Sequence, residues 1–182
     1  MQPLRERIEA FQTRAYDRVV RDDVAYTDTL ALTTAEINRL LELYRAGGRR
    51  QHQRLLRDAI DHWLRRYHGY TIGGSIGTHY RSLEIPSMDT VFEHVIPAKD
   101  LRDMLIAGAL TMAEALNAPV CRITKDQDRR LKASGLGSST PDRWHFFRRY
   151  SVLETEFYRV NDGAAIDISS YSLIDHYQHY IR

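Results

Sequence analysis

The sequence has very little cysteine, very little lysine and no long apolar run. Its single cysteine, Cys121, excludes an intrachain disulfide framework and a zinc site built from several cysteines. Cys121 stands in the apolar stretch Val120–Ile123, so we expect a small core residue. The longest mostly apolar stretch, Met104–Leu116, is interrupted by polar residues and is too short to span a bilayer. Residues 1–6 lack the apolar run of a secretory signal, so we expect a cytoplasmic protein that does not enter a membrane.

The scarcity of lysine makes the basic charge almost entirely arginine. The chain has 26 basic and 24 acidic residues, a formal net charge of +2. Of the basic residues 23 are arginine, and 13 of these lie in the first 66 positions. The planar guanidinium group, with five donors, matches phosphate groups and base edges better than lysine does. A GC-rich genome would give the same bias and acidic residues are interleaved, so nucleic-acid binding and an ordinary solvated surface both stay open.

The composition and length are those of a single globular domain. Hydrophobic residues make up 43% and charged residues 27% of the 182 positions, which suits one substantial core. Apolar residues at helical spacing predict three helices in the first third of the chain, over 3–22, over 33–46 behind a Thr33–Glu36 capping box, and over 49–68 before Gly69. The expected organisation is a helical unit at 1–68, an α+β core at 69–160 and a C-terminal helix at 161–182.

The rest of the chain mixes strand and helix signals. Glycines at 73, 74 and 77 predict a hairpin or irregular lid between Gly69 and Ser87, and they lack the spacing and the following lysine of a phosphate-binding loop. We then expect strands over 90–94, 120–124 and 151–160, and helices over 99–117, over 125–133 behind Thr124, around Trp144 to Tyr150, and over 170–181. The predicted fold class is α+β, with the helical unit packed on a small ββα-like core.

One motif carries chemistry, the stretch Glu93-His94-Val95-Ile96-Pro97 at the end of a predicted strand. Adjacent strand residues point to opposite faces, so Glu93 and His94 can share a site only where the strand ends or bends, and Pro97 provides such a break. This stretch resembles the first half of the HNH or His-Me finger nuclease motif, in which a ββα element holds a divalent metal. The resemblance implies that Glu93 is a metal ligand and that His94 is the general base.

The resemblance extends through residues 90–131. It implies that Asn117 orients His94 and that Asp126 or Asp128 is a further metal ligand, and such oxygen ligands suit Mg²⁺ or Mn²⁺. The chain departs from the family pattern because a predicted helix connects His94 to Asn117, an aspartate replaces the usual helix ligand, and the zinc-knuckle cysteines are absent. Asn117 as a helix C-cap and the aspartates as partners of the helix dipole are the structural alternatives.

Several basic residues are candidates for contacts to a nucleic acid, although a solvated or loop position is the alternative for each. They are Arg129, Arg130, Arg148, Arg149 and His79. The expected function is a divalent-metal-dependent endonuclease that hydrolyses phosphodiester bonds in DNA. The alternatives are a non-catalytic regulator or inhibitor that binds nucleic acid or protein while retaining a nuclease-like element, and a structural assembly subunit. The oligomeric state stays open, a homodimer included.

Overall fold

The structure is a computed structural model that describes residues 24–69, 78–83 and 89–180. Its helices are α2 (Val24–Arg45), α3 (Arg50–His68), α4 (Ala98–Ile106), α5 (Met112–Leu116), α6 (Lys125–Ala133), the 3-10 helix η2 (Phe146–Leu153) and α7 (Leu173–Tyr180). Its strands are β1 (Tyr80–Ser82), β2 (Thr90–His94), β3 (Val120–Thr124), β4 (Phe157–Arg159) and β5 (Ala165–Ile166). This combination confirms the α+β class. The helix predicted over 3–22 and the glycines at 73, 74 and 77 lie outside the described residues.

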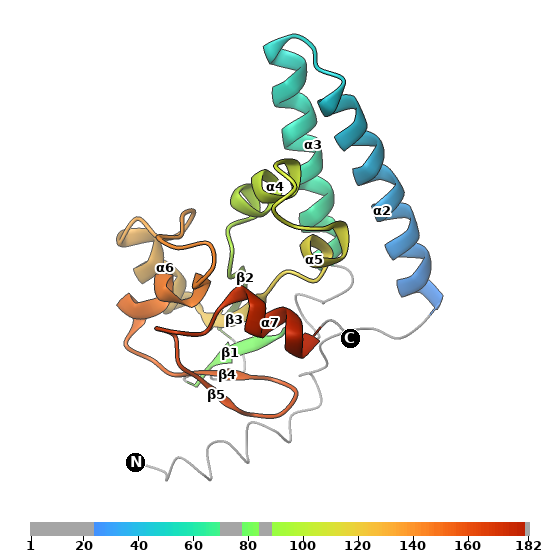
Figure 1. Cartoon of the computed structure of the whole chain (residues 1–182). Helices are drawn as coiled ribbons and strands as arrows, with labels where there is room; N and C mark the ends of the chain where they lie inside the picture. Colours follow the sequence, from blue (N-terminus) through green and yellow to red (C-terminus); the bar gives the residue numbers. More distant parts are fainter. Residues whose placement is uncertain (1–23, 70–77, 84–88, 181–182) are drawn as a thin grey trace.

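Helices α2 and α3 form a long hairpin that projects from one end of the molecule (Figure 1). Ile37 of α2 and Ile60 and Leu64 of α3 are buried because apolar residues recur on one face of each helix. The chain reverses at Gly47–Gly48, whose φ angles of 82° and 145° are unfavourable for residues with side chains. The predicted stop before these glycines and the predicted end of α3 at His68 are confirmed. None of the helices in the described part of the chain is long and apolar enough to cross a membrane.

The predicted helix start at Thr33 is wrong. Helix α2 begins at Val24 and passes through Thr33 to Arg45, and this stretch contains no glycine or proline. The Thr33 side chain is buried, and Glu36 pairs with Arg39 at 2.6 Å on the helix surface. Thr33 and Glu36 therefore do not form a capping box. The threonine packs inside the protein, and the glutamate forms a surface ion pair.

The five described strands form one mixed sheet in the order β2-β3-β1-β4-β5. Strand β1 is parallel to β3, and the other neighbouring pairs are antiparallel. In the β2–β3 pair, Glu93 lies opposite Cys121 and His94 lies opposite Val120. The predicted strands over 90–94 and 120–124 are thus confirmed, and Cys121 is buried as expected.

Helix α6 follows β3 directly and completes a ββα unit. The Thr124 hydroxyl accepts a hydrogen bond from the Gln127 backbone N–H at 3.1 Å, and the Gln127 side chain accepts one from the Thr124 N–H at 2.9 Å. This capping box starts the helix where the sequence predicted it. Leu131 is buried, and α6 packs against β2 and β3. The N–H of Lys125, the first residue of α6, donates to the Asp89 carbonyl oxygen at 2.9 Å, so α6 begins beside the start of β2. Asp128 and Lys132, further along α6, lie near Glu93 toward the end of the strand.

The connection between β2 and β3 differs from the single helix predicted over 99–117. Helix α4 ends at Ile106, and Gly108 takes a φ of 74°, which stops the helix. Helix α5 then begins behind Thr111, which forms a capping box with Glu114. The prediction of one helix is wrong. It followed the helix-favouring composition of the whole stretch and overlooked the two local boundary signals, Gly108 and Thr111.

The C-terminal third also differs in detail from the prediction. The helix expected around Trp144 to Tyr150 is the 3-10 helix η2, which runs on to Leu153. Glu154 has a φ of 51°, in the left-handed region, and turns the chain toward β4. The strand predicted over 151–160 is therefore shortened to β4. The predicted terminal helix corresponds to α7, with residue 181 outside the described part.

Buried histidine and tyrosine side chains attach α7 to the sheet. His176 Nε2 donates to the Asn117 carbonyl oxygen at 2.8 Å, and its Nδ1 lies 2.7 Å from the Tyr80 hydroxyl. The rings of His79 and His176 meet edge to face, with centroids 4.8 Å apart. Burial is the main cause that lowers the pKa of His176 to about 3 and the pKa of His79 well below its usual value. Both histidines are therefore neutral core residues at neutral pH.

Candidate functional site

A small pocket opens where β2 ends and the chain turns into α4. Its volume is about 120 Å³. It is lined by Arg65, Glu93, His94, Pro97, Ala98, Lys99, Gly137 and Ser138. Both residues of the predicted Glu93-His94 pair therefore border one pocket. Since small-molecule pockets usually measure about 300–1,000 Å³, this pocket suits a phosphate-sized group rather than a whole nucleotide.

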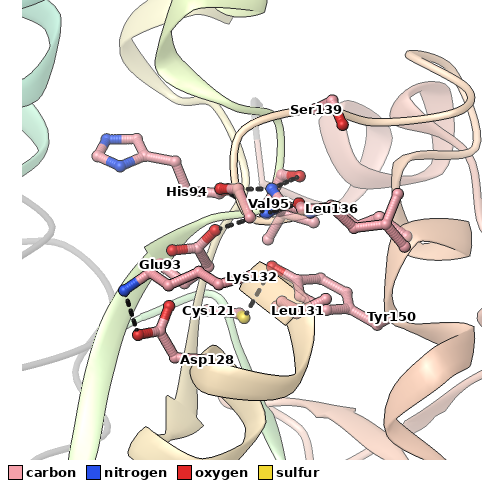
Figure 2. A network of polar contacts seen from close by, with 12 residues as sticks. Glu93, His94, Val95, Cys121, Asp128, Leu131, Lys132, Leu136, Ser139 and Tyr150 are labelled. Carbon is pink, nitrogen blue, oxygen red and sulfur yellow. Dashed lines mark hydrogen bonds and ion pairs between the residues drawn. The ribbon is translucent and has the colours of Figure 1, made fainter. Parts of the chain in front are cut away.

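The end of strand β2 is what brings Glu93 and His94 to the same pocket. Figure 2 shows their side chains diverging, with the Glu93 carboxylate directed toward α6 and the His94 ring directed away from it. This is the alternation of a strand. The chain leaves the strand at Val95, which is buried and whose N–H donates to the Pro119 carbonyl oxygen at 3.1 Å. The turn is thus fixed from within the core, as the motif predicted.

Glu93 is held by Arg149, whose side chain has no exposed surface. Arg149 Nη2 donates to Glu93 Oε1 at 2.8 Å. The other guanidinium contacts are to the carbonyl oxygens of His94, Val95, Leu136 and Gly137. Burial raises the pKa of the Glu93 carboxyl, the positive charge of Arg149 opposes this shift, and the negative charge of Asp128 adds to it. Glu93 Oε2 accepts no hydrogen bond from any described residue.

Asp128 is the acidic residue of α6 that lies beside Glu93 (Figure 2). Its Oδ2 accepts a hydrogen bond from Lys132 Nζ at 2.6 Å, and its side chain is only 16% exposed. Its Oδ1 has no hydrogen-bond partner in the described part of the chain. Asp126 is 69% exposed and pairs with Arg129 at 3.2 Å on the surface. Of the two predicted helix ligands, Asp128 is therefore the one placed beside Glu93.

His94 is hydrogen-bonded to a second histidine, His68, at the end of α3. His94 Nε2 lies 3.0 Å from His68 Nδ1, and His68 Nε2 lies 3.1 Å from the Ala115 carbonyl oxygen. A carbonyl oxygen only accepts, so His68 Nε2 carries a proton, His68 Nδ1 accepts, and His94 Nε2 donates. His94 Nδ1 is then the unprotonated nitrogen, and no described residue donates to it. Burial is the main cause that holds the pKa of His94 well below its usual value, and the positive charge of Arg65 adds to the shift.

Asn117 makes no described contact with His94. It is the C-cap residue of α5, and its Nδ2 donates to the Ala113 carbonyl oxygen at 2.9 Å. Its own carbonyl oxygen accepts the hydrogen bond from His176. Asn117 is therefore a helix C-cap, which is the structural alternative, and the described side chain that is hydrogen-bonded to the His94 ring is His68.

Two basic residues that the sequence did not single out line the pocket. Arg65 lies one turn before His68 on α3 and pairs with Asp61 at 2.7 Å while remaining 54% exposed. Lys99 is exposed in the first turn of α4 and makes no ion pair with the described residues. The N-cap residue of α4, Pro97, supplies no side-chain hydrogen bond, and its carbonyl oxygen accepts from the N–H groups of Asp100 and Leu101. One wall of the pocket is therefore positively charged.

The five residues predicted to contact nucleic acid fall into two groups. Arg129, Arg130 and Arg148 are exposed; Arg129 pairs with Asp126 in its own helix, and the other two donate to carbonyl oxygens of Val152 and Ser169. Arg149 and His79 are 0% and 1% exposed, so the predicted surface contact is wrong for these two. Arg149 is buried because it donates hydrogen bonds to the Glu93 carboxylate and to carbonyl oxygens around it. His79 is buried because it directly precedes β1 and its ring packs against His176 and Tyr180 of α7.

The fit of a divalent metal depends on Glu93 and Asp128. Among the residues that the structure describes, no group of three or more His, Cys, Asp or Glu side chains is placed to hold a metal ion. Glu93 and Asp128 nevertheless give two neighbouring carboxylates, each with one oxygen that accepts no hydrogen bond from the described residues. Mg²⁺ is usually held by one or two carboxylates, with water and substrate phosphates completing its shell. The residues present thus fit a metal shared with a substrate rather than a closed metal site.

The whole site is assembled from four elements, of which β2 and α4 are consecutive while α3 and α6 lie farther away in the sequence, on either side. Helix α3 contributes Arg65 and His68, β2 contributes Glu93 and His94, and α4 and α6 contribute Lys99 and Asp128. Comparison of the chain with protein-family models, curated proteins and solved structures gives no match. The pocket itself offers the His94 ring, a positively charged wall and the Glu93 carboxylate, and Asp128 lies beside Glu93 outside the pocket lining.

Proposed function

We propose that the protein is a divalent-metal-dependent endonuclease that hydrolyses phosphodiester bonds in DNA at the pocket at the end of β2. The observation that carries the proposal is that Glu93 and His94 border one phosphate-sized pocket at the start of a ββα unit. Arg65 and Lys99 supply positive charge at the same pocket. Phosphodiester hydrolysis requires these groups, because a base must activate water and cations must balance the phosphoryl charge.

In this proposal His94 Nδ1 takes the proton of the attacking water. The water oxygen forms a bond to phosphorus, the bond from phosphorus to the leaving oxygen breaks, and the leaving oxygen takes a proton from solvent. Burial keeps His94 neutral at pH 7, so its Nδ1 has a free lone pair to receive the proton. Arg65 and Lys99 hold the non-bridging oxygens of the phosphate and orient it for attack.

Glu93 and Asp128 are the residues that would hold the metal, through the oxygens that Arg149 and Lys132 do not occupy. A bound Mg²⁺ or Mn²⁺ would stabilise negative charge on the phosphate and on the leaving oxygen. The Arg149 guanidinium favours the ionised form of Glu93 and fixes its position. Lys132 is 66% exposed, so its side chain can turn away from Asp128 into solvent.

The wild-type protein is expected to nick supercoiled plasmid DNA in the presence of Mn²⁺ and to lose this activity when a chelator is added. His94→Ala is expected to lower the rate at least about a hundredfold, because a positioned general base contributes about 10²- to 10⁴-fold. His52→Ala is the matched control, because His52 is exposed in the first turn of α3 and lies outside the pocket. Cleavage without metal, or full activity of a folded His94→Ala protein, would contradict the proposal.

A second candidate function is a non-catalytic regulator that binds nucleic acid or protein. One observation favours it, namely that Arg149 and Lys132 already neutralise Glu93 and Asp128. In that case the plasmid is bound but not cleaved, and binding weakens steeply with salt while persisting in His94→Ala and Glu93→Ala. A protein that neither cleaves nor binds DNA or RNA at low salt would instead have a protein partner.

A further inference from the structure

His68 makes the only hydrogen bond to the His94 ring among the described residues. The nitrogen-to-nitrogen distance is 3.0 Å. The two ring planes are inclined at 55° with centroids 5.0 Å apart, so the rings meet through their nitrogens and do not stack. The contact is therefore a directed hydrogen bond between His94 Nε2 and His68 Nδ1.

His68 is itself fixed in orientation and in tautomer. Its side chain is fully buried, and its Nε2 donates to the carbonyl oxygen of Ala115, a buried residue of α5. With one nitrogen committed as a donor to a carbonyl, the ring can offer His94 only an acceptor. Burial lowers the pKa of His68 to about 4, so it stays a neutral acceptor at neutral pH. The two hydrogen bonds are therefore donated in the same direction, from His94 Nε2 to His68 Nδ1 and from His68 Nε2 to the Ala115 carbonyl oxygen.

We infer that His68 is the positioning residue of His94, holding its ring so that Nε2 carries the hydrogen and Nδ1 is the base nitrogen at the pocket. The inference rests on the proposed function for the chemistry of Nδ1. A group that hydrogen-bonds the second nitrogen of a functional histidine fixes its tautomer and ring orientation, and losing such a group typically costs about 10- to 100-fold in activity. His68 thus does for His94 what the family resemblance implied for Asn117.

The last turn of α3 therefore serves the pocket in two ways. Arg65 and His68 are three positions apart, which puts them on one face of the helix. Arg65 lines the pocket and pairs with Asp61, while His68 positions the base from behind. This makes the α2–α3 hairpin a structural part of the site, and a displacement of α3 would disturb both the base and one wall of the pocket.

The experiment compares His68→Leu with His68→Gln in the full chain. Leucine fills a similar volume and removes both hydrogen bonds. Glutamine keeps one acceptor and one donor, so it can accept from His94 Nε2 and donate to the Ala115 carbonyl oxygen. Long-range ¹H–¹⁵N spectra of the metal-free protein report the His94 tautomer, with the His94 signals assigned by their absence in His94→Gln. Cleavage kinetics with Mn²⁺ give kcat and KM separately.

We expect the wild type and His68→Gln to show a single His94 tautomer with the hydrogen on Nε2, and His68→Leu to show a mixture. We expect kcat to fall about 10- to 100-fold in His68→Leu with KM little changed, because His68 does not touch the substrate, and His68→Gln to recover most of the loss. A single Nε2–H tautomer in folded His68→Leu, or equal losses in both variants, would overturn the inference. If the leucine variant does not fold, His68→Asn replaces it, because its side chain is too short to span both partners.

The two claims can fail separately. If the wild type does not cleave DNA, the proposed function falls, but the tautomer of His94 in the metal-free variants still decides whether His68 positions that ring. If the wild type cleaves and the tautomer is insensitive to residue 68, the proposed function stands and the role of His68 falls.

Discussion

Arg149→Met is expected to lower the free energy of unfolding by about 3–5 kcal/mol, the usual cost of removing one partner of a buried ion pair. The substitution leaves Glu93, whose side chain is 17% exposed, without its cation. It also removes the donor to the carbonyl oxygens of His94 and Val95 at 3.0 and 3.1 Å, which fix the turn after β2. Methionine fills much of the volume, so the loss reports mainly the unpaired polar groups. Urea unfolding at pH 7 measures it.

Two comparisons separate this effect from a general sensitivity of η2. Arg148→Met is the matched control, because Arg148 is the exposed neighbour with a 48% exposed side chain, and its loss should stay within about 1 kcal/mol. Adding Glu93→Gln to Arg149→Met should restore part of the stability, because an amide needs no counter-charge. A loss in Arg149→Met no larger than that in Arg148→Met would show that Arg149 does not hold the end of β2.

The free energy of unfolding is also expected to fall by several kcal/mol between pH 7 and pH 5. Burial lowers the pKa of His68 to about 4 and that of His176 to about 3, whereas an unfolded histidine titrates near its usual value of 6.5. At pH 7 neither state binds these protons, and below about 6.5 only the unfolded state does. At 1.36 kcal/mol per pKa unit, each histidine contributes a loss of about 2 kcal/mol by pH 5. Glu93 acts in the opposite direction, because burial raises its pKa in the folded state and its protonation therefore favours folding as the pH falls.

Urea unfolding at half-unit steps from pH 7 to pH 5 measures this dependence. His176→Gln should be less stable than the wild type at pH 7, because it breaks the buried hydrogen bonds, but its stability should fall less steeply toward pH 5. His52→Gln should keep the wild-type slope, since His52 is exposed in both states. Stability that is flat across this pH range would mean that these histidines are not buried in neutral form.

The parts of the site that could be predicted from the sequence are those fixed by local signals. The strand that ends at His94 and the helix behind Thr124 each depend on residues a few positions apart, and both are present. Local signals also existed for the break at Gly108 and the new start at Thr111, but helix propensity favoured one continuous helix. Propensity summed over a window does not locate boundaries, whereas a glycine with positive φ does.

The parts that could not be predicted depend on contacts between distant segments. His68 and His94 are 26 positions apart, and Glu93 and Arg149 are 56 positions apart. Arginine is almost never fully buried unless it is paired. Because the partner of Arg149 is distant in the sequence, the residues around η2 do not indicate that this arginine turns inward. Arg65 was missed for the same reason, because its sequence pattern is that of a solvated helix face and it reaches the pocket only through the packing of α3 against α4. The pocket is thus made by tertiary packing around a locally predictable strand end.

The proposed hydrolysis depends on a divalent metal held by Glu93 and Asp128. The most direct test of this metal site is an anomalous difference map from crystals of the wild-type protein soaked in Mn²⁺. We expect a peak coordinated by Glu93 Oε2 and Asp128 Oδ1, with the Lys132 side chain displaced into solvent and Arg149 still on Glu93 Oε1. A map without a peak at these two carboxylates, with Lys132 still bound to Asp128, would contradict it.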